Sequence, residues 1–211
     1  VGAGGNWNVA SNWEVADNLA FTGAIAAVIS PTNLNSSGIF IRSGSPITVS
    51  SAVTADQLTV DAAATLTVET SGTLTIANGT GTDLSVASTG TLLTNSGTAT
   101  FVVNASATVQ VDGTFKEATA VPTVTVNGTI TIGATGTYEH GVNVGSIPTC
   151  TWASGSTCLL KGFTTGTPSG LGQAFHHFTV DCPALGVFHL STSGNLQTIN
   201  GNLTLISTGA S

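Results

Sequence analysis

The chain has 211 residues, of which only 6% are charged, and three basic residues against ten acidic ones give a formal net charge of −7. So few basic side chains cannot build the positive surface that holds phosphates, which excludes nucleic acid as a partner. No apolar run approaches the roughly 20 residues that a membrane-spanning helix needs, so we expect no membrane span.

Residues 1–50 follow no clear repeat and are predicted to form an N-terminal cap with irregular first coils. Two of the three Trp residues, Trp7 and Trp13, lie near its start. An open end of a repeat stack exposes apolar side chains and unpaired strand edges, which an aromatic-rich irregular segment can cover. Capping is therefore the favoured interpretation, and a pair of rings that stacks on sugars is the alternative.

Residues 51–211 are predicted to form the repeats. From Leu58 onward, short strands alternate an apolar residue with Thr, Ser or another polar residue, which is the pattern of a half-buried strand. Every third strand falls into one of three columns: Leu58, Leu84, Val109 and Ile130; Leu66, Leu92, Phe115 and Tyr138; Leu74, Phe101 and Val124.

The second column carries the clearest register, because the Gly-Thr pairs that begin at Gly90, Gly113 and Gly136 recur at two equal steps. Three strands per coil, stacked coil on coil, predict an all-β fold: a right-handed parallel β-helix, or β-solenoid, with coils of about 21–27 residues. An antiparallel sandwich with Asn-Gly and Asp-Gly hairpin turns is the alternative, but a sandwich has no reason to keep this long-range register.

Asn78, Asn104 and Asn127 occupy the turn after the third column. In coils spaced ~4.8 Å apart, Asn residues at one turn position can pass amide hydrogen bonds along the stack. Each also begins an Asn-x-Ser/Thr sequence, so glycosylation at these positions stays open.

After residue 140 the period loosens, and residues 162–172 are predicted to be a loop inserted into one coil. The repeat resumes at Phe178 and continues to Leu203 and Leu205. The pattern then stops at Ser211 without a polar cap, so we expect a longer native chain or another subunit at this end. The candidate end-to-end contact comprises Trp7, Trp13, Leu203 and Leu205.

The three Cys residues leave at least one thiol unpaired within the chain. Cys158 extends the second column and Cys182 follows about one coil later, so the two are candidates for a stack in successive coils. A disulfide between them and a ladder of buried free thiols are both compatible with the coil spacing of ~4.8 Å. Cys150 has no assigned partner.

Candidate catalytic and metal-binding groups are sparse. His140, His176, His177 and His189 show no metal-ligand spacing, and no nucleophile or dinucleotide motif is present. Only Lys116-Glu117 and Glu139-His140 gather ionisable groups, one coil apart, and they are interpreted as an exterior solvated turn rather than a catalytic or Ca²⁺ site. We therefore expect no enzyme activity, cofactor or metal.

Outward Thr pairs suggest a further alternative. Thr-x-Thr sequences at 65–67, 73–75, 123–125 and 129–131 resemble the hydroxyl arrays of ice-binding solenoids, although Thr is also a good exposed strand residue. Strict ice-binding arrays keep Thr-x-Thr in one column, and the second column breaks it at 91–94 and 114–116. Ice binding therefore ranks behind carbohydrate binding or polysaccharide processing.

The opening Gly-Gly-Asn-Trp-Asn-Val-Ala-Ser-Asn-Trp, the Gly-Thr-Leu-Thr-Ile repeats and the closing Asn-Gly-Asn-Leu-Thr-Leu resemble the repetitive surface proteins that Bacteroidetes secrete. That resemblance implies type IX secretion cargo, with large adhesins or fibres built from β-solenoid repeats. We expect an extracellular structural or surface-display protein, a segment or subunit of an adhesin or filament, with surface glycans as further partners. The abundance of Thr, Ser, Gly and Asn also favours secretion.

Overall fold

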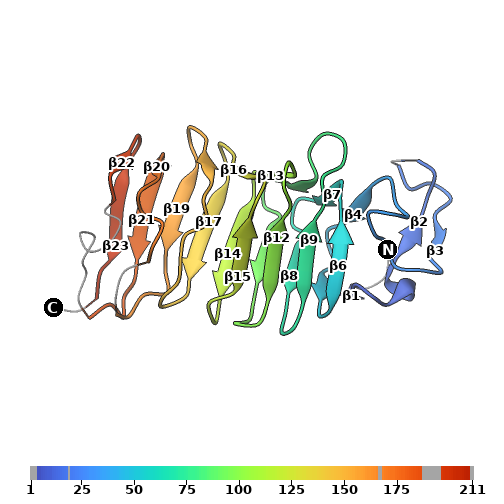
Figure 1. Ribbon diagram of the computed structural model, residues 1–211, viewed down its shortest axis with the longest axis horizontal. Helices are drawn as coiled ribbons and strands as arrows, with labels where there is room; N and C mark the ends of the chain where they lie inside the picture. The colour runs from blue at the N-terminus through green and yellow to red at the C-terminus, as the bar shows by residue number, and fades with distance from the viewer. Residues whose placement is uncertain (1–3, 19, 166–167, 187–195, 210–211) are drawn as a thin grey trace.

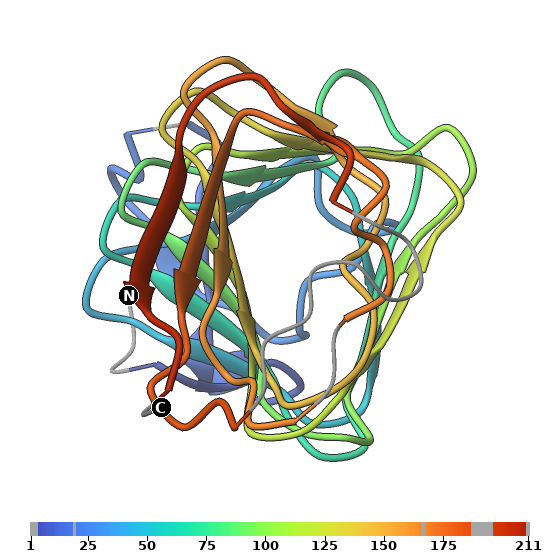
Figure 2. The same ribbon diagram turned by 90° about the vertical axis from the view of Figure 1, so that its left-hand side faces the viewer.

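The structure is a computed structural model that describes residues 4–18, 20–165, 168–186 and 196–209. Its strands lie side by side along one long axis, and the described residues nearest the N-terminus and nearest the C-terminus lie at opposite ends of the stack (Figure 1). Viewed along that axis, successive coils superimpose around a common outline (Figure 2). The predicted parallel β-solenoid is confirmed, with about seven turns.

Three parallel sheets form the sides of the stack, and every strand pair within them is parallel, which excludes the antiparallel sandwich. The largest sheet has nine strands: β1 (Gly5–Asn6), β5 (Ile47–Val49), β8 (Thr65–Val68), β11 (Thr91–Thr94), β14 (Thr114–Ala118), β17 (Thr137–Gly141), β19 (Thr157–Leu160), β21 (His177–Asp181) and β23 (Leu203–Ser207).

The other two sheets have six and four strands. The first contains β4 (Ile39–Ile41), β7 (Leu58–Val60), β10 (Leu84–Val86), β13 (Thr108–Val111), β16 (Thr129–Ile132) and β18 (Thr151–Trp152). The second contains β6 (Ala52–Ala55), β9 (Thr73–Ile76), β12 (Thr100–Val103) and β15 (Thr123–Val126).

Smaller elements lie at the two ends. A 3-10 helix, η1 (Ala10–Asn12), precedes the antiparallel pair β2 (Glu14–Val15) and β3 (Ile25–Ala26). Near the other end, β20 (Ala174–Phe175) pairs in parallel with β22 (Thr198–Ile199). Within the described residues, no helix is long and apolar enough to cross a membrane.

The three predicted columns are confirmed residue by residue. Leu66, Leu92, Phe115 and Tyr138 pair in register on successive strands, and all four are fully buried. The columns that begin at Leu58 and Leu74 keep the same register. Strict alternation along each strand therefore fills the interior with stacked apolar side chains and leaves the intervening Thr residues on the outside.

Close approach of the backbones explains the glycines that mark the register. A Cβ on Gly113 would lie 2.3 Å from the carbonyl oxygen of Gly90, and one on Gly136 would lie 2.1 Å from that of Val111. Each coil thus rests on the one before it at a point where a side chain has no room. The glycine of each Gly-Thr pair is therefore required by the contact between neighbouring coils.

The regular register extends beyond residues 51–211 at its N-terminal side, because β4 and β5 already pair in parallel with β7 and β8. Two coils after Tyr138 are shorter, and the step from Phe178 to Leu203 is longer again. Tyr138 pairs with Cys158 and Cys158 pairs with Phe178, and both steps are shorter than the step from Phe115 to Tyr138.

The predicted insertion at 162–172 is partly integrated into the solenoid. Phe163 and Leu171, near its two ends, are buried in the core, so these parts of the segment belong to the coil. Because Phe163 and Leu171 fill part of the apolar interior, these positions do not belong to a loop that projects from the coil. Residues 166–167, within the same segment, lie outside the described residues.

Candidate functional site

The solenoid interior contains one group of polar side chains on β14 and β17. Glu117 is 2% exposed, and Tyr138 and His140 are fully buried. The parallel register sets Glu117 directly opposite His140. Glu117 and His140 thus occupy an inner row that also contains the buried Thr94 and otherwise apolar residues.

The three side chains lie within hydrogen-bond reach of one another. Nδ1 of His140 is 2.9 Å from the Tyr138 hydroxyl and 3.2 Å from Oε2 of Glu117. Nε2 of His140 lies 3.3 Å from the carbonyl oxygen of Val144, which can only accept, so Nε2 carries the hydrogen of this bond. The ring of Phe163 stacks on the imidazole at 5.2 Å. Burial, followed by the neighbouring Glu117 carboxylate, raises the pKa of Tyr138 well above its usual value.

This arrangement corrects the interpretation of these residues as an exterior turn. Glu117 points inward, and Glu139 does not neighbour it on the outside: Glu139 pairs with Lys116, Oε1 to Nζ, at 2.8 Å. The alternation that places Phe115 inside also places Glu117 inside, and this was the signal in the sequence. With at most 2% exposure, the three buried groups offer a substrate no route from solvent.

The cysteines do not stack as expected. Cys158 is flanked in register by Tyr138 and Phe178, because this coil is shorter than the preceding ones, and Cys182 follows the end of β21 instead. All three thiols are free. Cys182 donates through Sγ to the carbonyl of Leu160 at 3.4 Å. Burial raises the pKa of Cys158 well above its usual value and that of Cys150 to about 12.

His176 and His177 form hydrogen bonds with the backbone of neighbouring coils. Nδ1 of His176 accepts from the backbone N–H of Gly155 at 3.0 Å, and Nδ1 of His177 accepts from that of Asn202 at 3.0 Å. Among the described residues, no group of three or more His, Cys, Asp or Glu side chains could hold a metal ion. His189 lies outside the described residues.

The four residues of the candidate end-to-end contact differ in exposure. Trp7 is fully buried and Trp13 is 8% exposed, with their rings 4.9 Å apart edge to face. Their indole N–H groups donate to the carbonyls of Pro31 and Trp7 respectively. The two rings therefore pack against the first coil and offer little surface to a second molecule or to a sugar. Leu203 and Leu205, in contrast, are 48% and 56% exposed.

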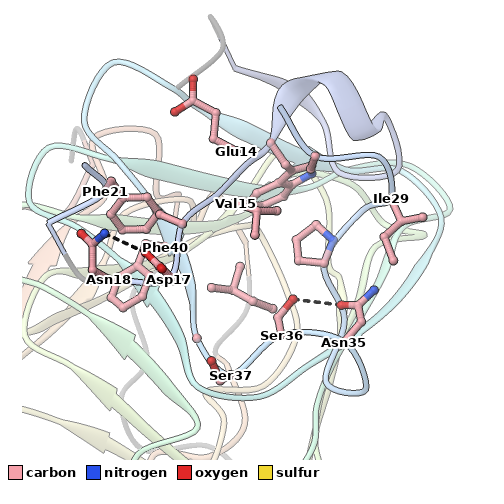
Figure 3. Close-up of a pocket in the computed structure, with 16 residues that line it drawn as sticks. Glu14, Val15, Asp17, Asn18, Phe21, Ile29, Asn35, Ser36, Ser37 and Phe40 are labelled. Atoms are coloured by element: carbon pink, nitrogen blue, oxygen red, sulfur yellow. Dashed lines mark hydrogen bonds between the residues drawn. The ribbon is translucent and has the colours of Figure 1, made fainter. Parts of the chain in front are cut away.

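A pocket that the sequence did not reveal opens in the N-terminal cap (Figure 3). Its volume is about 360 Å³, near the lower limit of about 300 Å³ for small-ligand pockets. The pocket lies between β2, the turn that follows it, the loop before β4 and β4 itself. Its walls combine aromatic and aliphatic side chains, including Phe21, Phe40 and Ile29, with polar groups, including Asp17 and Ser37.

Hydrogen bonds within the cap hold the two loops around this pocket. Asn18 donates to the carbonyl of Thr22 at 3.1 Å and accepts from its backbone N–H at 3.2 Å. Asn35 donates to the carbonyl of Ser30 and accepts from the backbone N–H of Thr32 at 2.7 Å. Both amide side chains are thus used to shape the loops.

The outward Thr residues form ladders on two sheets. On the four-stranded sheet, Thr73, Thr100 and Thr123 pair in register, but Val102 interrupts the neighbouring row. On the nine-stranded sheet a single ladder continues over five coils: Thr65, Thr91, Thr114, Thr137 and Thr157. Its neighbouring row contains Lys116 and Glu139, so this face is not a uniform hydroxyl array.

Comparison with known proteins identifies no relative: no family model, no curated protein and no solved structure matches the chain.

Proposed function

We propose that this chain is a structural, surface-display β-solenoid: one segment of a longer extracellular rod, adhesin or filament. The observation that carries the proposal is the state of β23, the last strand of the nine-stranded sheet. Its inward positions are apolar, yet they are exposed.

The register identifies which side chains of β23 belong to the core. Leu203 pairs with Phe178, and Leu205 pairs with Val180 beyond it. Phe178 and Val180 are fully buried, whereas Leu203 and Leu205 are about half exposed, and the neighbouring Ile206 is 65% exposed. Leu203 and Leu205 thus continue two interior columns, and no coil among the described residues covers them.

An open parallel edge of this kind is a template for another strand. The strand that covers β23 belongs either to a further coil of the same polypeptide or to another subunit. In both cases the stack becomes longer, by ~4.8 Å per coil, and a repeat protein that contacts only its neighbours can extend in this way indefinitely. Length is the property that a surface spacer or fibre requires.

The location and the family are part of the same proposal. The resemblance to secreted Bacteroidetes surface proteins and the composition rich in Thr, Ser, Gly and Asn support an extracellular site. A surface with few charges and many hydroxyl groups suits a protein that is exposed to varying ionic conditions, because little of its stability depends on screened charge pairs.

The test is the mass of the purified chain in solution over a series of concentrations. We expect mass to rise with concentration through end-to-end association. Leu205→Asp should abolish this association, because it places a charge on the apolar edge. The matched control is Thr204→Asp, which changes the outward neighbour on the same strand and should associate like the parent. A parent chain that stays monomeric at high concentration would refute docking of subunits at this end.

Native material gives a second readout. Electron microscopy of the source cells' surface fraction should show rods that antibodies against this chain decorate along their length. Decoration of compact particles alone would contradict the rod.

A further inference from the structure

We propose that the pocket in the N-terminal cap binds the neutral ring of a carbohydrate. The proposal is independent of the rod function, since it concerns the opposite end of the solenoid and a different set of side chains.

Two aromatic rings form one wall of the pocket and are fixed before any ligand arrives. Phe21 and Phe40 meet edge to face, with centroids 5.7 Å apart. The guanidinium of Arg42 lies 5.2 Å from the centroid of Phe21, and Arg42 is itself held by Asp61, Nε to Oδ2, at 2.8 Å. Phe40 comes from β4, the first strand of the six-stranded sheet, so the wall stands on the rigid part of the molecule.

The backbone at Phe21 adopts a conformation that a bulky side chain rarely takes. Its φ of 53° lies in the left-handed region, where a bulky side chain is disfavoured. Among the non-glycine residues with positive φ in the described ranges, Phe21 is the one aromatic side chain. Gly23, in the same turn, has a φ of 72° and open space at its Cβ position, so the turn itself does not need an aromatic ring. The ring at Phe21 is therefore explained by what it contacts.

The charges around the pocket define the ligand. The carboxylates of Asp17 and Glu14 line it, and none of the described residues that line it is Lys, Arg or His. An anionic ligand would meet these carboxylates without a cation on the walls to offset the repulsion. A ligand cation would meet the positive charge of Arg42, whose guanidinium lies over the ring of Phe21 beside this wall.

A neutral sugar ring fits both halves of this wall. Its C–H face can pack against the half-buried rings of Phe21 and Phe40, and its hydroxyl groups can donate to the carboxylate of Asp17, which otherwise accepts from Asn18 at 3.0 Å. The hydroxyl of Ser37 adds a group that can donate and accept on the same rim. Figure 3 shows these aromatic and polar side chains around a common opening. At about 360 Å³ the pocket has room for the end of a glycan, and it is not a long groove for a polymer.

The experiment titrates isotope-labelled chain 1–211 with neutral oligosaccharides: cellotetraose, xylotetraose and mannotetraose. Tetragalacturonate and tetramethylammonium are the anionic and cationic comparisons. We expect at least one neutral sugar to bind with a Kd of about 1 mM or tighter, with amide shifts confined to residues 13–40. Binding of only the anion or only the cation would overturn the proposal, as would shifts located on the sheets.

Phe40→Ser then tests the wall. Phe40 is the outward residue of β4, flanked by the buried Ile39 and Ile41, so the core is left intact. We expect affinity to fall by about tenfold or more. The control is Leu34→Ser, which removes a side chain that is 90% exposed in the same cap but outside the pocket, and should bind as the parent does. Equal affinity of the Phe40 variant and the parent would refute the assignment, and the wild-type shift map decides the matter if the variant fails to fold.

Discussion

Two pairs of interacting polar side chains lie side by side between β14 and β17, one on each face of the same sheet. Lys116 and Glu139 meet on the outer face at 2.8 Å, with side-chain exposures of 37% and 14%. One position further along, Glu117 and His140 meet on the inner face at 3.2 Å, almost without exposure. The same strand register sets the partners of both pairs opposite each other, but one pair joins Lys to Glu in contact with water and the other joins Glu to His in the interior.

The difference shows what each face of the solenoid contributes. On the outer face, water competes for both partners and the pair adds little to stability. On the inner face, each group loses its hydration and depends on the other, so the pair is costly to break although it is not an efficient source of stability. The buried pair adds a polar requirement to a register that the chain period and the close contacts at Gly113 and Gly136 also favour.

Phe115→Asp should have the largest effect, because it adds an unpaired carboxylate to the inner face. Phe115 is fully buried and contacts the rings of Phe101 and Tyr138 at 5.5 Å. We expect the free energy of unfolding to fall by about 4 kcal/mol or more, as measured by urea denaturation. Thr114→Asp, the outward neighbour, should cost about 1 kcal/mol or less. Similar losses for the two variants would contradict the inner and outer assignment of β14.

His140→Ala should be next in size. It leaves Glu117 buried without its imidazole partner and removes the ring that stacks on Phe163, for an expected loss of about 3–5 kcal/mol. The double variant Glu117→Leu with His140→Leu should lose much less, because no unpaired polar group remains. If the double variant lost as much free energy of unfolding as Glu117→Leu and His140→Leu lose together as single variants, the two side chains would not act as a pair.

Alkaline pH should weaken the inner face by an intermediate amount. Burial raises the pKa of Cys158 above its unfolded value of 9.0, so the unfolded chain loses this proton first. Stability is therefore fully present below about pH 9 and falls as pH rises above it, by about 1.4 kcal/mol per pH unit. Urea denaturation of the wild type and of Cys158→Val from pH 8 to pH 10 measures the effect. Parallel pH profiles of the two proteins would show that Cys158 does not titrate in this way.

Lys116→Ala should have the smallest effect, about 0–1 kcal/mol, because its partner Glu139 stays in contact with water. Added salt should reduce even this difference, whereas the effect of His140→Ala should persist in salt. A loss above about 2 kcal/mol for Lys116→Ala would mean that the outer pair resembles the inner one.

The sequence was a good guide where one rule governs many residues. Alternation placed Leu66, Leu92, Phe115 and Tyr138 in one column, and the Gly-Thr step supports this for the last three. The same alternation assigns Glu117 and His140 to the interior, but their ionisable side chains favoured a position on the exterior. Composition alone could not decide between the two rules, since a buried carboxylate is tolerable only where another strand supplies its partner.

By itself, the sequence determined the parallel register, the apolar columns and the contact between coils at Gly113 and Gly136, because these depend on local alternation and on a period that the chain repeats. Only the tertiary structure decided the position of Cys182, which depends on the length of one coil, and the pocket between Phe21 and Phe40. Phe21 lies in the turn after β2 and Phe40 lies on β4, and no sequence repeat relates the two positions. Their rings meet where the turn after β2 packs against β4, a contact between segments that no periodicity encodes.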